Sequence, residues 1–406
     1  MVNVIGLGYI GLPTALMLAS HGVEVIGTDY NEGLVDMLSN GRVTFQEEGL
    51  EEIFTSALKS GIRFTSEYQA ADTYIVAVPT PYNSMSKKVN AEYVKEAVEK
   101  ILSVCRDETT IIIESTISPG TIDRQIRPLI ELNQVQNKKE IYLAHAPERI
   151  IPGNMIQELL YNNRTIGADD KKIGEKVKNL YISFCRGEII ITDIRTAEMT
   201  KVVENTFRDI NIAYANELAK ICYSDNLDVY EIIRIANKHP RVNILSPGPG
   251  VGGHCISVDP WFLVGDYPGL ANIILAARKI NDSMPEFVLE RVSKLMTEHG
   301  IRDVSKIGFY GLTYKANVDD VRESPTLQLL ECMEKHLAYG VKVYDPFVRN
   351  SIVDNQYFDF DEFVENIELV VIMVGHKEII QRQELLREKI VFDTCNVLRE
   401  IESYKL

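Results

Sequence analysis

The sequence lacks long apolar runs and dense blocks of charge of one sign. No apolar stretch reaches the ~18 residues that a membrane-spanning helix requires. Lysine and arginine together number 43 against 58 aspartates and glutamates, which gives a net charge of -15 at pH 7. Because no basic cluster stands out against this acidic background, we expect the protein to bind neither nucleic acid nor a membrane surface.

Cysteine is also scarce. The six cysteines, at positions 105, 185, 222, 255, 332 and 395, form no C-x-x-C pair and no zinc-type spacing with the seven histidines. A disulfide scaffold would contain cysteine at higher density. We therefore expect reduced thiols and no metal site. The first residues, MVNVIGLGYIG, carry no positively charged segment of the kind found in a secretion signal, so the expected location is the cytoplasm.

Glycine is absent from Glu188 to Pro247 and then crowds into Ser246–Leu263, SPGPGVGGHCISVDPWFL. Glycine adopts backbone conformations closed to other residues and lets main-chain amides approach a ligand, while proline stiffens the turns between them. Three glycines stand just ahead of the cysteine of this loop: Gly250, Gly252 and Gly253. A loop of this composition can direct several N–H groups at an anion.

Cys255 is the residue around which this loop is built. A free cysteine taken alone is most often a small buried apolar residue. The glycine-rich setting, with polar His254 and acidic Asp259 close by in the chain, favours a different role. Free amides would stabilise a thiolate, or an oxyanion formed beside it, so we treat Cys255 as a candidate nucleophile.

The N-terminus contains a strand, a glycine turn and a helix. Val2–Ile5 is predicted to be a buried strand, and Leu12–Ser20 has helical composition. Between them Gly6 permits a tight turn, Gly8 lets a pyrophosphate approach the backbone, and Gly11 allows close packing of helix on strand. The helix N-terminus then faces the phosphates.

A second strand, Val23–Thr28, ends in Asp29, 18 residues past Gly11. A carboxylate there can accept hydrogen bonds from ribose hydroxyls and would repel a ribose phosphate, so the sequence favours NAD over NADP. The alternative is a glycine turn in some other α/β protein. The spacing of the turn, the second strand and the acid favours a dinucleotide site.

Further strands alternate with helices in the first half of the chain. Tyr74–Val78, Ile111–Ser115 and Ile141–Ala144 are predicted strands, with Ala91–Val104 as one of the helices between them. This alternation predicts a parallel, doubly wound sheet. Polar residues follow three of the strands, and they are Thr80, Thr116, Glu148 and Arg149. Each is compatible with a simple turn or cap, but their shared position at the carboxyl edge favours a common cleft.

Thr196–Tyr223 is free of glycine and proline and is predicted to be a long helix. Lys201, Asn205 and Arg208 lie at i, i+4 and i+7, which places them on one face that is either solvated or lines an anionic ligand. Asp225–Lys238 is a second predicted helix. A third helical run, from Gly269 to His299, is interrupted only at Pro285, where we expect a kink. Long helices between two α/β units commonly form a spacer and a subunit contact, so we expect a homodimer.

A second alternating set begins at Lys306. The predicted elements are strand Lys306–Tyr310, helix Pro325–Leu337, and strands Val341–Tyr344, Leu369–Val374 and Ile390–Asp393. The first turn of this set, GLTYKANVDDVRESP, lacks the glycine pattern, so we expect no second dinucleotide. Lys315 and Arg322 in this turn are candidates to reach phosphates. The predicted fold is α/β, with two Rossmann-like doubly wound domains at 1–194 and 301–406 joined by a helical region at 195–300.

With these motifs identified, the chain resembles the UDP-sugar 6-dehydrogenase family over essentially its full length. The resemblance rests on GLGYIGLP, VPTP, ESTISPGT, PER, TAEMTKVVENTFRD, the loop around Cys255, and YKANVDDVRESP. Within the family, NTFRDINIAYANEL and HPRVNILSPGPGVGGHCISVDPWF look most like the branch that acts on UDP-N-acetylmannosamine. The branch that acts on UDP-glucose usually lacks this HPRVN and HC arrangement.

The resemblance implies oxidation of the primary alcohol of a UDP-sugar to a carboxylate, in two steps that use two NAD and pass through a thioester on Cys255. A thiolate is needed, and a nearby cation such as Lys201 would lower the pKa of the thiol. By the same match, Lys201 and Asn205 stabilise the oxyanion at carbon six, and Glu148 and Asp259 handle water or protons in hydrolysis.

The remaining site residues are also implied by the resemblance. The positions that match NAD contacts are Gly6, Gly8, Tyr9, Ile10, Gly11, Asp29, Thr80, Thr116 and Arg322. The positions that match substrate contacts are Arg149, Ile150, Lys201, Asn205, Arg208, His239, Arg241, Gly252, Tyr314 and Lys315. One departure is Ser257, where many relatives carry proline, and this change makes the register between Cys255 and Asp259 less firm.

Three alternatives remain open at this point. The first is a different UDP-sugar substrate, UDP-N-acetylglucosamine or UDP-glucose, because an acetamido group is recognised by the shape of a pocket that one sequence does not display. A single-step β-hydroxyacid dehydrogenase would share the N-terminal domain and the helical lysine and asparagine, but it would need neither Cys255 nor a second Rossmann-like half. A non-catalytic NAD-binding protein would not need the cysteine, the lysine and the carboxylates together.

Overall fold

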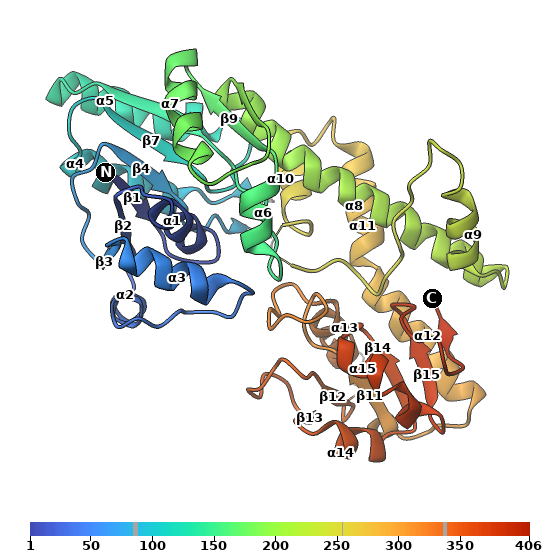
Figure 1. The fold of residues 1–406 in the computed structure, drawn as a ribbon. Coiled ribbons are helices and arrows are strands. Elements are labelled where there is room, and N and C mark those ends of the chain that lie inside the picture. The colour runs from blue at the N-terminus through green and yellow to red at the C-terminus, as the bar shows by residue number, and fades with distance from the viewer. Residues whose placement is uncertain (84–87, 254, 336–338) are drawn as a thin grey trace. The chain divides into compact units, whose positions relative to one another are not determined.

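The computed structural model describes residues 1–83, 88–253, 255–335 and 339–406 (Figure 1). His254 and the last residues of the predicted helix Pro325–Leu337 lie outside this part of the chain. The described chain forms two compact units, Met1–Glu204 and Asn205–Leu406. The predicted three-part division of the chain stays a prediction. In the described part, no helix has the length and apolar character needed to cross a membrane.

The first unit is built on one eight-stranded sheet with the order β10-β9-β8-β7-β4-β1-β2-β3. The strands are β1 (Val2–Ile5), β2 (Val25–Thr28), β3 (Arg63–Thr65), β4 (Thr73–Val76), β7 (Thr109–Ile113), β8 (Ile141–His145), β9 (Arg164–Ala168) and β10 (Ile189–Thr192). A separate antiparallel pair joins β5 (Tyr82–Asn83) to β6 (Lys88–Val89). From β1 the chain adds strands first on one side and then on the other, so the predicted doubly wound arrangement is confirmed.

One strand pair departs from the predicted parallel sheet. β8 and β9 pair antiparallel, with Ala144 opposite Ala168. Only the short helix α6 (Met155–Tyr161) lies between them. β9 therefore begins at the edge where β8 ends, because the chain makes no crossover to the opposite edge.

Helices cover both faces of this sheet. They are α1 (Gly11–Ser20), α2 (Glu32–Ser39), α3 (Leu50–Lys59), α4 (Glu92–Val104), α5 (Arg127–Asn137) with the π-helical turn η1 (Ile122–Ile126) before it, α6, and α7 (Lys171–Ile182). Alternate strand residues point to opposite faces. Val4 and Ile75 join the core that contains α1, whereas Ile5 and Val76 join the core that contains α4.

The predicted long helix is confirmed as α8 (Ile194–Ser224), which begins in the first unit and continues into the second. Within the second unit a buried ion pair ties α8 to α11 (Asn272–Asp282). Arg278 Nη1 lies 2.5 Å from Asp209 Oδ1, and Asn281 Nδ2 donates to the same oxygen at 2.8 Å. Burial raises the pKa of Asp209, while the Arg278 charge acts in the opposite direction.

The prediction of one kinked helix from Gly269 to His299 is wrong. It is two helices, α11 and α12 (Met284–Glu298), which are separated at Ser283. Pro285 lies in the first turn of α12, where its missing N–H has no helical partner to lose. The helix predicted at Asp225–Lys238 is also shorter, since α9 (Val229–Ala236) begins only after Asp228 caps it by accepting from two backbone N–H groups.

The second unit contains a six-stranded sheet with the order β13-β12-β11-β14-β15-β16, in which every pair is parallel. Its strands are β11 (Ile307–Tyr310), β12 (Lys342–Tyr344), β13 (Gln356–Tyr357), β14 (Leu369–Ile372), β15 (Ile390–Asp393) and β16 (Tyr404–Lys405). Its helical segments are α10 (Asp259–Asp266), η2 (Val304–Lys306), α13 (Pro325–Lys335), α14 (Phe360–Glu365), α15 (Lys377–Gln381) and η3 (Gln383–Leu386). The strand order matches that of the core of the first sheet, so the predicted second Rossmann-like half is confirmed.

Candidate active site

The glycine turn after β1 is shaped by close backbone packing. Gly6 has φ +90°, and a Cβ on it would lie 2.7 Å from the Ala77 carbonyl oxygen. A Cβ on Gly11 would lie 1.8 Å from the Gly6 carbonyl oxygen, which is incompatible with any side chain. A Cβ on Gly8 would meet nothing within 4 Å. The turn is therefore tight at its two ends and open in the middle, where the sequence pattern expects a pyrophosphate.

Asp29 is fixed at the carboxyl edge beside this turn. β1 and β2 are parallel neighbours, and their last residues, Ile5 and Thr28, lie opposite each other. The residues that follow the two strands therefore lie at the same edge of the sheet. The Leu7 N–H donates to Asp29 Oδ2 at 2.8 Å, and the Asn31 N–H donates to Oδ1 at 2.9 Å. The side chain is half-buried, so its carboxylate is held in place and still reaches the surface.

The other predicted cofactor residues of this unit lie near the same edge. Tyr9 is 37% exposed, and its ring centroid lies 4.5 Å from that of Phe45. Ile10 immediately precedes α1. The Thr80 hydroxyl donates to the Thr116 carbonyl at 2.7 Å, which joins the segments that follow the neighbouring strands β4 and β7. Two observations support NAD binding at this edge: the open space above Gly8, and the Asp29 carboxylate held by backbone N–H groups.

Glu148 follows β8 and is buried. Its Oε1 accepts from the Arg149 N–H at 2.7 Å, and its Oε2 lies 2.5 Å from Nη2 of Arg164 on β9. Arg164 also lies 3.7 Å from Oε1 of Glu114, at the end of β7. Sequence reasoning missed Arg164 and Glu114. Glu114 stands in the quoted ESTISPGT motif, so its position in that motif was the available signal.

The Arg149 side chain is engaged within the first unit. Its guanidinium donates to the Asn163 carbonyl at 2.8 Å and to the Thr165 hydroxyl at 2.9 Å, and it lies 2.6 Å from Glu204 Oε1. Ile150 is buried in the core that contains α1. The substrate contacts predicted for these two residues stay predictions.

The long helix α8 carries three of the predicted polar residues. Lys201 and Asn205 are both buried, one turn apart, whereas Arg208 is exposed. Asn205 Nδ2 donates to Oδ2 of Asp259 at 2.6 Å, and Asp259 is itself only 3% exposed. The structure therefore joins two residues that are far apart in sequence and that were both predicted to act near the sugar carbon.

Cys255 and Asp259 are linked by a tight turn into α10. The Asp259 and Val258 N–H groups donate to the Cys255 carbonyl at 2.8 and 3.1 Å, while the cysteine residue is exposed. The Ser257 hydroxyl donates to the Gly253 carbonyl. This side-chain hydrogen bond spans the turn at the position that the sequence analysis marked as a departure, and the backbone bonds to the Cys255 carbonyl set the register between Cys255 and Asp259.

The glycine loop packs directly on the segment after β11. A Cβ on Gly252 would lie 2.4 Å from the Glu323 carbonyl oxygen and 2.7 Å from Tyr314 Cβ. Gly253 has φ +85°, and its N–H donates to the Arg322 carbonyl at 3.0 Å. Of the predicted binding residues, Gly252, Tyr314 and Arg322 therefore lie in one packed region of the second unit.

The side chains of the segment after β11 are exposed at two predicted positions. Lys315 is exposed, and its carbonyl accepts from the Thr313 hydroxyl at 2.9 Å. Arg322 is exposed and forks onto Asp320, with Nε 2.9 Å from Oδ1 and Nη2 2.7 Å from Oδ2. If Arg322 binds a phosphate as predicted, its guanidinium contacts both that phosphate and Asp320.

His239 and Arg241 lie exposed in the turn after α9, where the Arg241 N–H donates to His239 Nδ1 at 3.3 Å. Asparagines that sequence reasoning missed hold the chain between this turn and the glycine loop. Asn211 on α8 binds the Asn243 carbonyl and the Leu245 N–H. Asn216, also on α8, accepts from the Gly248 N–H at 2.9 Å, and Asn237 binds both backbone groups of Ile244.

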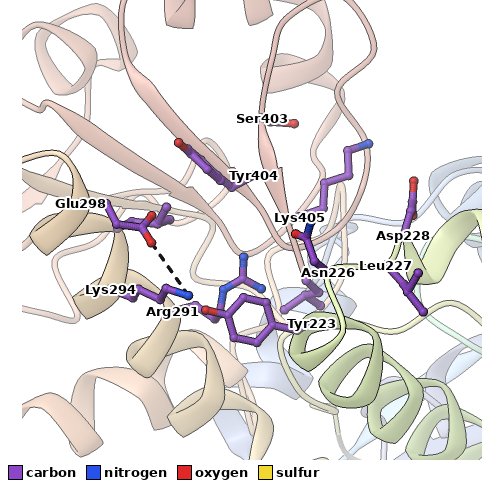
Figure 2. Close-up of a pocket in the computed structure, with 12 residues that line it drawn as sticks. Tyr223, Asn226, Leu227, Asp228, Arg291, Lys294, Glu298, Ser403, Tyr404 and Lys405 are labelled. Atoms are coloured by element: carbon purple, nitrogen blue, oxygen red, sulfur yellow. Dashed lines mark ion pairs between the residues drawn. The ribbon is translucent and has the colours of Figure 1, made fainter.

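A cavity of about 530 Å³ lies in the second unit between the end of α8, α12 and β16 (Figure 2). None of the predicted catalytic or binding residues lines it. Figure 2 shows Arg291 beside the ring of Tyr223, 3.7 Å from its centroid, and the ion pair of Lys294 with Glu298 at 3.9 Å. Within the described ranges no group of three or more histidine, cysteine or acidic residues is arranged to hold a metal ion.

Three family domains match the chain in order. The NAD binding domain of the UDP-glucose/GDP-mannose dehydrogenase family matches residues 1–185, its central domain matches residues 195–283, and its UDP binding domain matches residues 308–400. The chain belongs to the UDP-glucose/GDP-mannose dehydrogenase family. The predicted family and the predicted cofactor, NAD, are confirmed, and the enzyme is a nucleotide-sugar oxidoreductase.

Individual relatives cover nearly the whole chain. It is 44% identical to a UDP-N-acetyl-D-mannosamine dehydrogenase of Methanococcus maripaludis, over 98% of this chain and 93% of that protein. It is 39% identical to an NDP-N-acetyl-D-galactosaminuronic acid dehydrogenase of Ralstonia nicotianae, over 97% and 95%. The native structure of the UDP-N-acetyl-mannosamine dehydrogenase from Staphylococcus aureus shares 41% identity with a TM-score of 0.88, over 100% of this chain and 97% of that one.

Proposed function

We propose that this enzyme oxidises the C6 hydroxyl of UDP-N-acetyl-D-mannosamine to a carboxylate, with two NAD per sugar and a thioester on Cys255. The observation that carries the proposal is the exposed Cys255, held on a packed glycine loop in a chain that has NAD binding and UDP binding domains. The names of the relatives from Methanococcus maripaludis and Staphylococcus aureus support this choice of sugar.

NAD, when bound at the glycine turn, accepts a hydride in each of the two oxidations. Gly6, Gly8 and Gly11 would leave room for the pyrophosphate, and Asp29 would accept from the adenosine ribose hydroxyls. This assignment rests on the space above Gly8 and on the fixed, half-buried carboxylate.

Cys255 attacks the carbonyl carbon of the aldehyde formed in the first oxidation. The sulfur bonds to that carbon, and the carbonyl oxygen takes the negative charge, which Lys201 and the Asn205 amide stabilise. After the second hydride leaves the same carbon, the product is a thioester. Asn205 is held by Asp259, so its amide is oriented before substrate arrives.

Water releases the product from the thioester. As the water oxygen bonds to the carbonyl carbon, its proton passes to Glu148, the C–S bond breaks, and Cys255 leaves as a thiolate. Glu148 is assigned this role by the family resemblance, and its carboxylate is buried and held in place by its contact with Arg164. Asp259 is the second carboxylate assigned to proton handling in this step.

A second candidate substrate is a UDP-linked N-acetyl sugar of the galacto series, which the relative from Ralstonia nicotianae suggests. UDP-N-acetylglucosamine and UDP-glucose remain further alternatives. A panel of these UDP-sugars, assayed for NADH and for the acid formed, distinguishes them. We expect UDP-N-acetylmannosamine to give the highest kcat/KM and two NADH per sugar when the sugar is limiting.

Cys255→Ala tests the thioester directly. The variant should form no acid and should still bind NAD, because the glycine turn belongs to the other unit. Cys332→Ala, in α13, is the matched control and should still give two NADH. One NADH per sugar from the unaltered enzyme would instead support a single-step dehydrogenase.

We also propose a homodimer that forms along α8. Phe207, Tyr214 and Ile221 recur at heptad spacing on this helix and are 66%, 52% and 52% exposed. An exposed apolar stripe of this kind favours a partner helix. The exposed Arg241 is then a candidate to reach the substrate of the neighbouring subunit. The cytoplasm is the proposed location, because all six cysteines are free thiols and the mechanism needs Cys255 reduced.

A further inference from the structure

Glu148 belongs to a buried ionisable cluster in the first unit. The other members are Glu114, which follows β7, and Arg164 on β9, while Glu148 itself follows β8. Their side chains are 0%, 4% and 5% exposed, respectively. The Tyr181 hydroxyl on α7 donates to Glu114 Oε1 at 3.0 Å, and the Arg164 guanidinium stacks 4.6 Å from the Tyr181 ring centroid.

The cluster holds two carboxyl groups and one guanidinium. If all three were charged, the buried cluster would carry a net negative charge, which is costly away from water. One retained proton makes it neutral. Two carboxyls that share one cation therefore compete for it, and the proton is retained by the carboxyl that the cation contacts less closely.

Geometry decides which carboxyl keeps the proton. Glu148 lies 2.5 Å from Arg164 and accepts from a backbone N–H at 2.7 Å. Glu114 lies farther from this cation, at 3.7 Å, and its Oε1 accepts from the neutral Tyr181 hydroxyl instead. Burial raises the pKa of Glu114, the Glu148 charge raises it further, and Arg164 acts in the opposite direction. Glu114 is therefore the protonated member, and the guanidinium pairs closely with Glu148.

We propose that Arg164 is a positioning residue that orients the Glu148 carboxylate for thioester hydrolysis, with Glu114 kept uncharged so that the guanidinium pairs with Glu148 alone. This inference rests on the proposed function, because it assigns Glu148 the role of base toward water. Arg164 itself touches neither substrate nor cofactor in this scheme. Its contribution is to set the direction of the neighbouring carboxylate and to place a positive charge beside it.

The remaining groups around Arg164 do not compete for its charge. The titratable groups that face it are Glu114 and Glu148, which follow β7 and β8, Tyr181 on α7, and Cys185 just after α7. Tyr181 meets it through the ring face, and burial raises the pKa of the Tyr181 hydroxyl well above its usual value. The Arg149 side chain points elsewhere, to Asn163, Thr165 and Glu204.

The test compares Arg164→Met with Arg164→Lys in the full-length enzyme, with the exposed Arg186→Met as the matched control. In Arg164→Met we expect hydrolysis to slow about 10- to 100-fold and the acidic limb of its pH profile to move to higher pH. The burst of NADH formed before hydrolysis should keep its rate, and covalently loaded Cys255 should accumulate in the mass spectrum. Arg164→Lys should have a pH profile between those of Arg164→Met and the unaltered enzyme. Lysine keeps the positive charge but lacks the planar guanidinium that can bind a carboxylate at two points.

Glu114→Gln supplies a second variant that keeps the size of the side chain. In the unaltered enzyme, ionisation of Glu114 at high pH would draw Arg164 from Glu148 and lower the hydrolysis rate. Glu114→Gln removes that ionisation, so the alkaline decline should move to higher pH. If the profile of this variant superimposes on that of the unaltered enzyme, the inference is overturned, even if Arg164→Met fails to fold.

Different results would contradict the role of Arg164 and the thioester mechanism on which it rests. If Arg164→Met slows the burst and the hydrolysis equally and leaves the pH midpoints unmoved, Arg164 is merely structural and the inference is overturned. If the unaltered enzyme gives one NADH per sugar and no loaded Cys255, the proposed function itself is wrong.

Discussion

Gly252→Ala tests whether the cysteine loop depends on close packing. A methyl group at this position would lie 2.4 Å from the Glu323 carbonyl oxygen and 2.7 Å from Tyr314 Cβ. Neither contact can be relieved by rotating a flexible side chain, because one is backbone and the other is a Cβ. The loop must therefore move away from the segment after β11, and Cys255 must move with it.

The size of the effect follows from the cost of overpacking. Inserting a methyl group into a packed site typically costs about 1–3 kcal/mol. For a unit the size of Asn205–Leu406, each kcal/mol lowers the midpoint of thermal unfolding by about 2–4 °C. We therefore expect the transition of this unit to fall by roughly 4–8 °C, for a cost of about 2 kcal/mol. A shift of the nucleophile by ~1 Å should lower kcat about 100-fold.

Gly248→Ala is the matched control in the same loop. A Cβ on Gly248 would meet nothing within 4 Å, and its backbone conformation does not require glycine. This variant should be as stable as the parent or more stable by about 0.4–1 kcal/mol, since alanine restricts the unfolded chain. Calorimetry and steady-state kinetics on both variants decide the matter. Equal unfolding midpoints and equal kcat for the two variants would refute the packing argument.

Three further predictions follow from particular residues. Asp29→Asn should narrow the preference for NAD over NADP at least about tenfold, because it removes the repulsion of a ribose phosphate; equal use of both cofactors by the unaltered enzyme would contradict this. Mixing inactive Cys255→Ala and Arg241→Ala subunits under exchange should restore activity if Arg241 acts in trans, and no recovery despite demonstrated exchange would exclude it. Arg278→Met should cost about 3–5 kcal/mol of unfolding free energy because it leaves Asp209 buried without its cation, and adding Asp209→Leu should recover most of that loss; equal losses in the single and double variants would show that the ion pair is unimportant.

Much of the fold could be predicted because its strands are short, apolar and regularly separated by helices. The antiparallel strand β9 was harder to predict, because its sequence RTIGA (Arg164–Ala168) contains arginine, threonine and glycine and forms no continuous apolar run. The break at Ser283 was missed for a different reason. A proline inside a helical pattern is compatible with a kink or with the first turn of a new helix, and only packing selects between them.

The candidate site likewise contains features that the sequence shows and features that only the fold brings together. Motifs that lie within one stretch of chain, such as the glycine turn and the loop around Cys255, were visible because their residue types are unusual in themselves. The pair of Asn205 with Asp259 joins two motifs, so each partner was expected, although the bond between them was not. Arg164 escaped because an arginine in a strand has no local signature. Its importance comes only from the neighbours that the sheet order gives it.

The two sheets also show why a shared architecture need not bind the same ligand. In each unit an acid follows the second strand and accepts from the turn after the first, Asp29 from the Leu7 N–H and Asp345 from the Leu312 N–H at 2.6 Å. Asp29 remains half-buried and reaches the surface. Asp345 is fully enclosed, and its Oδ2 also lies 3.2 Å from His376 Nε2. Burial raises the pKa of Asp345, but the hydrogen bond from His376 opposes this effect and the pKa is lowered overall. Because the oxygens of Asp345 are committed to the fold, restoring the glycine spacing after β11 would still leave no acid free to bind a ribose there. The two equivalent acids therefore differ in exposure, because Asp29 is half-buried and Asp345 is fully enclosed.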